Sequence, residues 1–218
     1  RIRTLLLLLF AAACAFFAWR KWNVVEKLVV PVERVPGEPI DSLNGVIVRY
    51  NDGMNAIHGR NVVDRYNVGL NYQCVEFVKR YYLEHYDHRM PNSYGHAKAF
   101  FDTTLADGAL NKDRGLLQFS NPSSTAPRVG DLVVMGAWAG NSFGHVAIIS
   151  ALEGDEVEIV QQNTRSTRNS FDLENSDGRY RIESDRILGW LRFLDTFRVP
   201  YSHHPSSHEA SLLPAIFR

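Results

Sequence analysis

The pattern of apolar and polar residues has a helical period between residues 74 and 84. From Cys74, apolar side chains recur at i+3, i+4, i+7 and i+8. These apolar residues are Phe77, Val78, Tyr81 and Tyr82. Charged residues occupy the positions between them: Glu76, Lys79, Arg80 and Glu84. The pattern predicts an amphipathic helix that buries the face carrying Cys74 and turns its charged face outward.

Residues typical of turns and helix N-caps precede this helix, namely Asn67, Gly69 and Asn71. Cys74 is therefore expected in the first turn, where unpaired backbone N–H groups and the positive end of the helix dipole stabilise a thiolate. We expect the pKa of Cys74 to fall and its reactivity to rise. A free cysteine is also often a small buried hydrophobic residue, and the helix alone leaves both interpretations open.

Shorter apolar runs bounded by turn residues predict strands in the rest of the chain. Residues 45–50 are expected to form the first strand, followed by a polar loop up to the helix. Residues 94–101 suggest a second short helix, and residues 117–128 a loop rich in Ser, Pro and Asn. Further strands are expected at 129–135, 145–150, 157–163 and 187–193.

A hairpin turn at residues 153–156 returns the chain toward His145. Strand side chains alternate between the two faces of a sheet, so Gln161 and Asn163 share one face and Gln162 takes the other. A hairpin loop with an odd number of residues would set His145 opposite Asn163 and diagonal to Gln161. A two-residue loop would place Gln162 there instead.

Residues 5–19 are an uninterrupted run of apolar or small residues with cations on both sides. As a helix the run would span roughly 22 Å, against about 30 Å of membrane hydrocarbon, and flanking Trp19, Arg20, Lys21 and Trp22 could cover the difference. We expect residues 1–22 to be an uncleaved membrane anchor. A cleaved signal peptide, which would make the protein secreted, is the alternative.

The composition of the remaining chain predicts a tether, a folded domain and a C-terminal tail. Prolines and a glycine in residues 23–43 disfavour a regular helix, so this segment is expected to be a tether. Residues 44–194 are expected to form the folded domain and residues 195–218 a C-terminal tail. The tail contains His203, His204 and His208 but no cysteine or carboxylate at a metal-binding spacing, so no metal site is expected there.

Composition narrows the possible functions. A chain of 218 residues with 45% hydrophobic content fits one full-sized domain with appendages. Lys and Arg total 24, as do Asp and Glu, so no basic surplus suggests nucleic acid as a partner. The two cysteines, Cys14 and Cys74, lie in different sequence contexts, which argues against a disulfide framework.

A cysteine followed far along the chain by a histidine and then an amide is the order expected of a nucleophile, its general base and an orienting group. Five motifs extend this pattern, and together they resemble the CHAP family of cysteine, histidine-dependent amidohydrolases and peptidases. The resemblance is closest to the amidase domain of bifunctional glutathionylspermidine synthetase/amidase and covers about residues 44–193. The motifs are residues 72–77 (Tyr-Gln-Cys-Val-Glu-Phe), 130–132 (Gly-Asp-Leu), 144–149 (Gly-His-Val-Ala-Ile-Ile), 157–163 and 187–190 (Ile-Leu-Gly-Trp).

This resemblance implies a papain-like α+β fold of the NlpC/P60 type, with the cysteine helix packed on an antiparallel sheet and a single membrane-directed helix before it. It implies amide hydrolysis through a thioester, with Cys74 as nucleophile, His145 as general base and no metal or organic cofactor. The third position falls on Gln161, where the amidase domain has glutamate, and Asn163 is the alternative orienting residue. The Cys74 backbone N–H, with Gln73 as a weaker candidate, would hold the oxyanion.

Domains of this family cut either cell-wall peptides or the amide of a glutathione–polyamine conjugate. The N-terminal apolar segment favours an extracytoplasmic peptide amidase held to the membrane by a single pass. A glutathionylspermidine-type amidase is the alternative. Because Gln161 lacks the charge that stabilises an imidazolium, a catalytically inactive, membrane-tethered binding domain is a second alternative.

Overall fold

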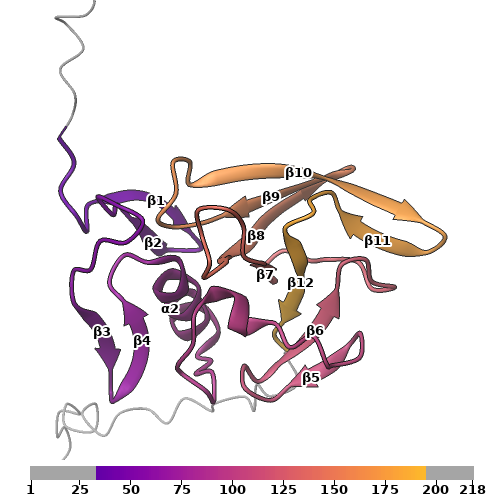
Figure 1. Ribbon diagram of the computed structural model, residues 1–218, viewed down its shortest axis with the longest axis horizontal. Coiled ribbons are helices and arrows are strands. Elements are labelled where there is room, and N and C mark those ends of the chain that lie inside the picture. Colours follow the sequence, from indigo (N-terminus) through magenta and orange to yellow (C-terminus); the bar gives the residue numbers. More distant parts are fainter. Residues whose placement is uncertain (1–32, 195–218) are drawn as a thin grey trace, which may run out of the picture. The chain divides into compact units, whose positions relative to one another are not determined.

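An eight-stranded antiparallel sheet forms the main layer of the fold (Figure 1). The computed structural model describes residues 33–194. The strands follow the order β11-β10-β9-β8-β7-β12-β6-β5. Their bounds are β5 Ala109–Asn111, β6 Leu116–Ser120, β7 Leu132–Met135, β8 His145–Glu153, β9 Glu156–Val160, β10 Arg168–Ser176, β11 Arg179–Ile182 and β12 Ile187–Arg192.

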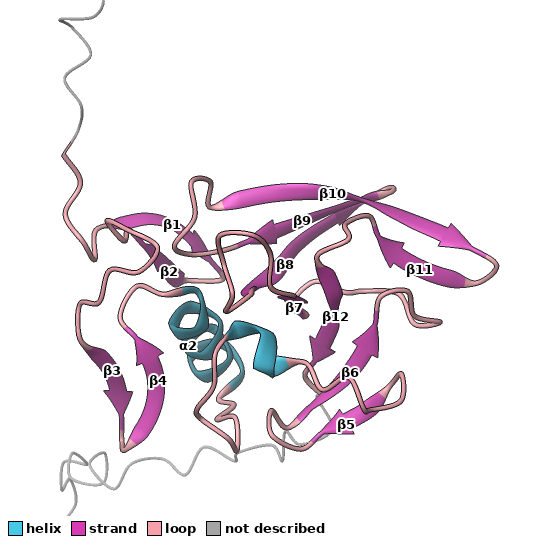
Figure 2. Ribbon diagram, in the orientation of Figure 1, coloured by secondary structure: helices cyan, strands magenta, loops and turns pink. Residues whose placement is uncertain are grey.

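One α-helix, α2 (Cys74–Tyr86), packs against β8 and against two separate hairpins (Figure 2). The hairpins are β1 (Pro39–Leu43) with β2 (Val46–Arg49), and β3 (Arg60–Val63) with β4 (Tyr66–Leu70). A 3₁₀ helix, η1 (Ala97–Phe100), contacts β7 and β8. The α+β class and the cysteine helix beside an antiparallel sheet are therefore confirmed.

The central strands bury both of their faces. Along β7, Leu132 and Val134 belong to the core beneath α2, whereas Val133 and Met135 belong to a second core on the opposite face. The alternation follows the two-residue period of a strand, and burial on both faces explains the nearly continuous apolar runs in the sequence.

The sheet curls so that its β11 end approaches the chain just after β6. The Asn121 side-chain amide donates to the carbonyl of Ile182 at 2.9 Å, and Ser123 pairs with Tyr180 as an isolated bridge. Ile182 and Trp190, from β11 and β12, fill the second core inside this curl. Strands of the sheet thus close part of its own apolar face.

The helix at Cys74 and the strands at 46–49, 132–135, 145–153 and 187–192 agree with the sequence predictions. The helix is not amphipathic in the way expected, however. Glu76, Lys79 and Arg80 are 3%, 1% and 7% exposed, because the two hairpins cover the face that was expected to meet solvent. Hydrogen bonds to carboxylate and backbone groups make this burial possible.

Several expected loops are strands. The polar stretch before the helix contains β3 and β4, so Asn67 and Gly69 lie in a strand and not in a turn. Strand β6 extends into the stretch expected to be a Ser/Pro/Asn loop, and Pro39–Leu43, assigned to the tether, forms β1. The returning strand β9 ends at Val160, three residues earlier than predicted. The second helix is the single 3₁₀ turn η1.

The predicted anchor at residues 1–22 and the tail at 195–218 lie outside the described residues. Within residues 33–194, no helix has both the length and the apolar character needed to cross a bilayer.

Candidate active site

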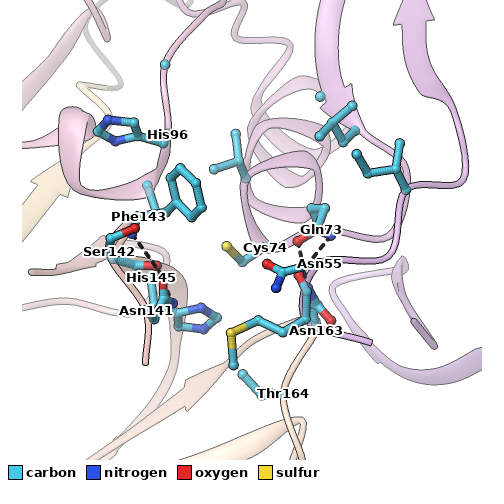
Figure 3. Close-up of a pocket in the computed structure, with 18 of the residues that line it drawn as sticks. Asn55, Gln73, Cys74, His96, Asn141, Ser142, Phe143, His145, Asn163 and Thr164 are labelled. Carbon is cyan, nitrogen blue, oxygen red and sulfur yellow. Dashed lines mark hydrogen bonds between the residues drawn. The ribbon is translucent and has the colours of Figure 1, made fainter. Parts of the chain in front are cut away.

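Cys74 is the first residue of α2, directly after the N-cap residue Gln73. Strand β4 fixes this end of the helix by direct backbone packing, because a Cβ placed on Gly69 would lie 3.0 Å from the Glu76 Cα. In Figure 3 the Cys74 side chain points into a cleft toward the segment that carries His145. The position in the first turn is as predicted, although the Gln73 side chain makes no capping hydrogen bond.

The expected fall in the pKa of Cys74 is wrong. Burial raises the pKa of the thiol to about 11, because a thiolate would lose its hydration. The backbone N–H groups of Val146, Val75 and Cys74 oppose this effect without overcoming it. The contact with Val146 also places the thiol beside the residue that follows His145.

His145 is the first residue of β8 and is 6% exposed. Gly144 before it has a φ of 74° and leaves room for no side chain. A Cβ there would lie 2.5 Å from the Met135 carbonyl oxygen and 2.9 Å from the Lys98 Cβ. Glycine is therefore required where the loop enters β8, which explains the Gly-His pair physically.

A bulge in the β8–β9 hairpin brings Gln161 to His145. The turn pairs Glu153 with Glu156 and so has two residues, the case expected to favour Gln162. The pairing register then shifts by one residue between Ile149 and Ala151. Beyond this bulge the strands pair as they would after a loop with an odd number of residues. Gln161 Oε1 consequently lies 3.0 Å from His145 Nε2, as a three-residue loop would have arranged.

The surroundings of Gln161 define the tautomer of His145. Gln161 Nε2 donates to the Ser166 carbonyl at 3.0 Å, so its Oε1 is the atom that faces the imidazole. An amide oxygen only accepts hydrogen bonds, and therefore His145 Nε2 carries the proton. The other ring nitrogen, Nδ1, keeps its lone pair. Burial lowers the pKa of His145 to about 4, against a small opposing effect of Gln161.

Asn163, the alternative orienting residue, makes other contacts. Its Nδ2 donates to Gln73 Oε1 at 2.6 Å and to the Met54 carbonyl at 3.1 Å (Figure 3). Gln73 Nε2 in turn donates to the carbonyls of Met54 and Ala56. Asn163 and Gln73 therefore hold the 54–56 loop at the rim of the cleft, and both amide hydrogens of the Gln73 side chain are already engaged.

Gln162 is a site residue whose role the sequence did not reveal. It is fully buried and its amide nitrogen donates to the Gln73 carbonyl and to Glu76 Oε2, both at 3.0 Å. Glu76 also accepts from Arg80 Nε at 2.7 Å. This network ties the start of α2 to the segment that carries Gln161. The only sequence signal was that Gln161 and Gln162 are adjacent, so that strand alternation turns their side chains to opposite faces.

The cleft around Cys74 and His145 has a volume of about 1050 Å³. Its walls include the 54–57 loop, residues 93–97, the loop between β7 and β8, and residues 163–165. Exposed apolar side chains stand at its rim: Met54, Ile57, Tyr94 and Phe143. Within residues 33–194, no group of three His, Cys, Asp or Glu side chains is placed to hold a metal ion.

Residues 65–163 match the family model of the CHAP domain. This match confirms the resemblance to the CHAP family. The match includes Cys74, His145 and Gln161 and ends at Asn163.

Two curated relatives show the same likeness. The chain is 27% identical to trypanothione synthetase of Crithidia fasciculata over 167 residues, which are 68% of this chain and 26% of the relative. It is 30% identical to bifunctional glutathionylspermidine synthetase/amidase of Escherichia coli over 149 residues, which are 61% of this chain and 23% of the relative. The chain thus spans about a quarter of the length of each relative.

A solved structure, Ly7917 with the hydrolyzing product of MDP, aligns with a TM-score of 0.36 and 20% identity. The alignment covers 56% of this chain and 54% of that chain.

Proposed function

We propose that the CHAP domain is a cysteine-dependent amidase or peptidase that hydrolyses an amide bond through a thioester on Cys74. The contact between His145 Nε2 and Gln161 carries the proposal, because it leaves the Nδ1 lone pair of a buried, neutral imidazole able to accept a proton. We assign the Cys74 thiol as the proton donor, because it contacts the backbone of Val146, the residue that follows His145. A nucleophile on a helix and a base on the facing sheet is the papain-like arrangement.

The reaction then starts from a neutral Cys74 thiol and a neutral His145 imidazole. The Cys74 sulfur attacks the amide carbonyl carbon while its proton passes to His145 Nδ1, and the carbonyl oxygen becomes an oxyanion. The C–N bond breaks as His145 returns that proton to the leaving amine, and a thioester remains. Water attacks the thioester, His145 takes a proton from the water, and the acid product leaves as Cys74 regains its proton.

The oxyanion is held by the Cys74 backbone N–H at the open end of α2. The Gln73 side chain is the weaker candidate, since its amide hydrogens already bind the carbonyls of Met54 and Ala56. Gln73 is better suited to position Asn163 and the 54–56 loop.

The rival proposal, an inactive binding domain, draws on the glutamine at 161. A carboxylate there would stabilise the imidazolium, whereas the amide provides orientation without charge. Orientation is nevertheless intact, because both ends of the Gln161 amide are bonded. We therefore favour a working, charge-neutral catalytic pair.

Purified protein containing the described domain, offered short peptides, tests the proposal. New amine and carboxyl termini are expected from the wild type, and Cys74→Ala and His145→Ala should each lower turnover at least about 1000-fold, since nucleophile and base act as a unit. Circular dichroism should show both variants folded. Turnover near wild type in either folded variant would refute the mechanism.

We also propose that the apolar run at 5–19 places this domain outside the cytoplasm, which would suit a cell-wall peptide as substrate and disfavour a cytosolic polyamine conjugate. Protease added to intact cells that carry the full chain should then cut the domain. Cleavage only after the membrane is opened would contradict this placement.

A further inference from the structure

We propose that the active-site cleft recognises carboxylate groups of its peptide substrate through Arg60, Arg165 and Arg186. The inference rests on the proposed function, since it defines the substrate class of the same cleft.

The cleft wall has a one-sided charge. Its lining residues include these three arginines and no aspartate or glutamate. The whole chain has equal numbers of acidic and basic residues, 24 of each, so this imbalance does not reflect a basic protein. A concave site lined by one sign of charge concentrates its field and attracts ligands of the opposite sign.

The three arginines keep N–H donors available for a ligand. Arg60 makes one side-chain hydrogen bond, from its Nη1 to Asn67 Oδ1 at 2.8 Å. The Arg186 guanidinium lies 4.9 Å from the centre of the Trp138 ring, a contact that uses its face and leaves its edge open. Arg165 is exposed, and its side chain has no hydrogen bond or ion pair to another residue of the described part of the chain.

Two other arginines of the domain are paired with carboxylates. Arg192 binds the Asp131 carboxylate with two nitrogens, and Arg168 binds Asp41 and Glu158. Because a guanidinium presents five donors in a planar fork, a carboxylate is the group it binds best in two-point geometry. The unpaired edges in the cleft are therefore suited to carboxylates supplied by a ligand.

The arginines come from separate parts of the fold, so they would bind different substrate groups. Arg60 begins β3 and pairs with Leu70, close before Cys74 in the chain. Arg165 follows Asn163 in the loop after β9, and Arg186 lies between β11 and β12. A peptide with acidic side chains on either side of the scissile amide matches this spread, whereas a polyamine, which is a polycation, would be repelled.

Binding to the Cys74→Ala variant measures recognition without turnover. We would compare a hexapeptide that has glutamates on both sides of its central amide and a free C-terminus with a twin carrying glutamines and a C-terminal amide. The acidic peptide is expected to bind at least about tenfold more tightly at low salt, and the preference should shrink as salt screens the charges. In the Cys74→Ala background, Arg60→Gln, Arg165→Gln and Arg186→Gln should each weaken acidic-peptide binding about three- to tenfold and leave the neutral twin unchanged.

Arg181→Gln is the matched control, because Arg181 is paired with Glu183 and lies outside the cleft lining. It should change neither affinity. Equal affinities for the two peptides, or tighter binding of a spermidine-bearing twin, would overturn carboxylate recognition even if the wild type cleaves peptides. Lack of cleavage by the wild type, with the acidic preference intact, would refute the amidase and leave the recognition standing.

Discussion

Gln161 joins His145 to the Ser166 carbonyl through the two ends of one amide. The bond orients the imidazole, but it adds no negative charge that would favour the imidazolium. Burial accordingly lowers the pKa of His145 to about 4 and raises that of Cys74 to about 11, so both groups are neutral at pH 7. An uncharged glutamine at position 161 is thus consistent with a neutral Cys74 thiol and a neutral His145 imidazole.

Replacing Gln161 with glutamate should therefore change the pH dependence of kcat/KM. A carboxylate beside Nε2 favours the protonated ring and raises the pKa of His145, by about 1–3 units. Because the base must be neutral, the acid limb of the profile should move to higher pH by that amount. Asn163→Ala is the control, since Asn163 bonds to Gln73 and Met54 and its loss should leave the acid limb in place. An unmoved acid limb in Gln161→Glu would contradict the assigned role.

At the residue scale, the sequence predicts which residues are candidates for the site better than it predicts the surroundings of each side chain. Cys74, His145 and Gln161 are candidates because of their order and motifs, and the structure brings His145 and Gln161 into contact. The pKa of Cys74 could not be predicted, because its direction depends on how the rest of the fold surrounds the thiol. The separation of Asn163 from His145 also depends on the chain leaving β9 at Val160, which alternation cannot reveal.

The elements position these residues through close packing at a few points. Strand β8 receives His145 from a loop that touches η1, and the Lys98 N–H donates to the Phe143 carbonyl at 2.8 Å. Residues 93–97 form another wall of the cleft. The chain around them is held by Arg114, which is 1% exposed. Its guanidinium donates to the carbonyls of Asn92, Tyr94 and Ala99.

Gly144→Ala should damage both stability and activity. The new Cβ would meet the Met135 carbonyl oxygen and the Lys98 Cβ, so overpacking should add about 1–3 kcal/mol to the cost of the positive φ. Gly140→Ala is the matched control, because Gly140 also has a positive φ, 92°, but has nothing within 4 Å of the added Cβ. Urea denaturation and kcat/KM would compare them. Equal losses in the two variants would show that the close approach at Gly144 is unimportant.

Arg114→Met should destabilise the domain by about 3 kcal/mol, because three backbone carbonyls lose a charged donor within a buried site. KM should rise more than kcat falls, since the cleft wall loosens while Cys74 and His145 stay in place. Arg89→Ala, which removes an exposed pair with Asp64, should cost at most about 1 kcal/mol and leave KM unchanged. Similar denaturation midpoints for both variants would be inconsistent with this role for Arg114.

Apolar periodicity identified the elements that carry the core, α2, β2, β7, β8 and β12. It missed strands such as β10, where most side chains are polar and exposed. Hydrogen bonding to β9 and β11 makes that segment a strand, and such pairing leaves little trace in local sequence. The burial of Glu76 and Arg80 likewise depends on packing between elements, since the two hairpins that precede α2 cover them.

At the scale of the whole molecule, the formal net charge is zero, yet the cleft is lined by arginines and by no carboxylates. The total charge therefore could not predict this local excess of positive charge. The family resemblance correctly indicated a CHAP domain, and the matched region carries the residues of the proposed reaction. The anchor and the extracytoplasmic location remain predictions, because residues 1–22 lie outside the described part of the chain.

Intact-mass spectrometry of the acid-quenched protein tests the central claim, a thioester on Cys74, most directly. The protein would be mixed for seconds with an acidic peptide activated as a nitrophenyl ester, so that acylation outpaces hydrolysis. We expect a mass increase equal to the acyl group, mapped to Cys74 by peptide digestion and absent in Cys74→Ala. His145→Ala should acylate far more slowly. Catalytic release of product with no adduct, at a rate that Cys74→Ala retains, would contradict the account.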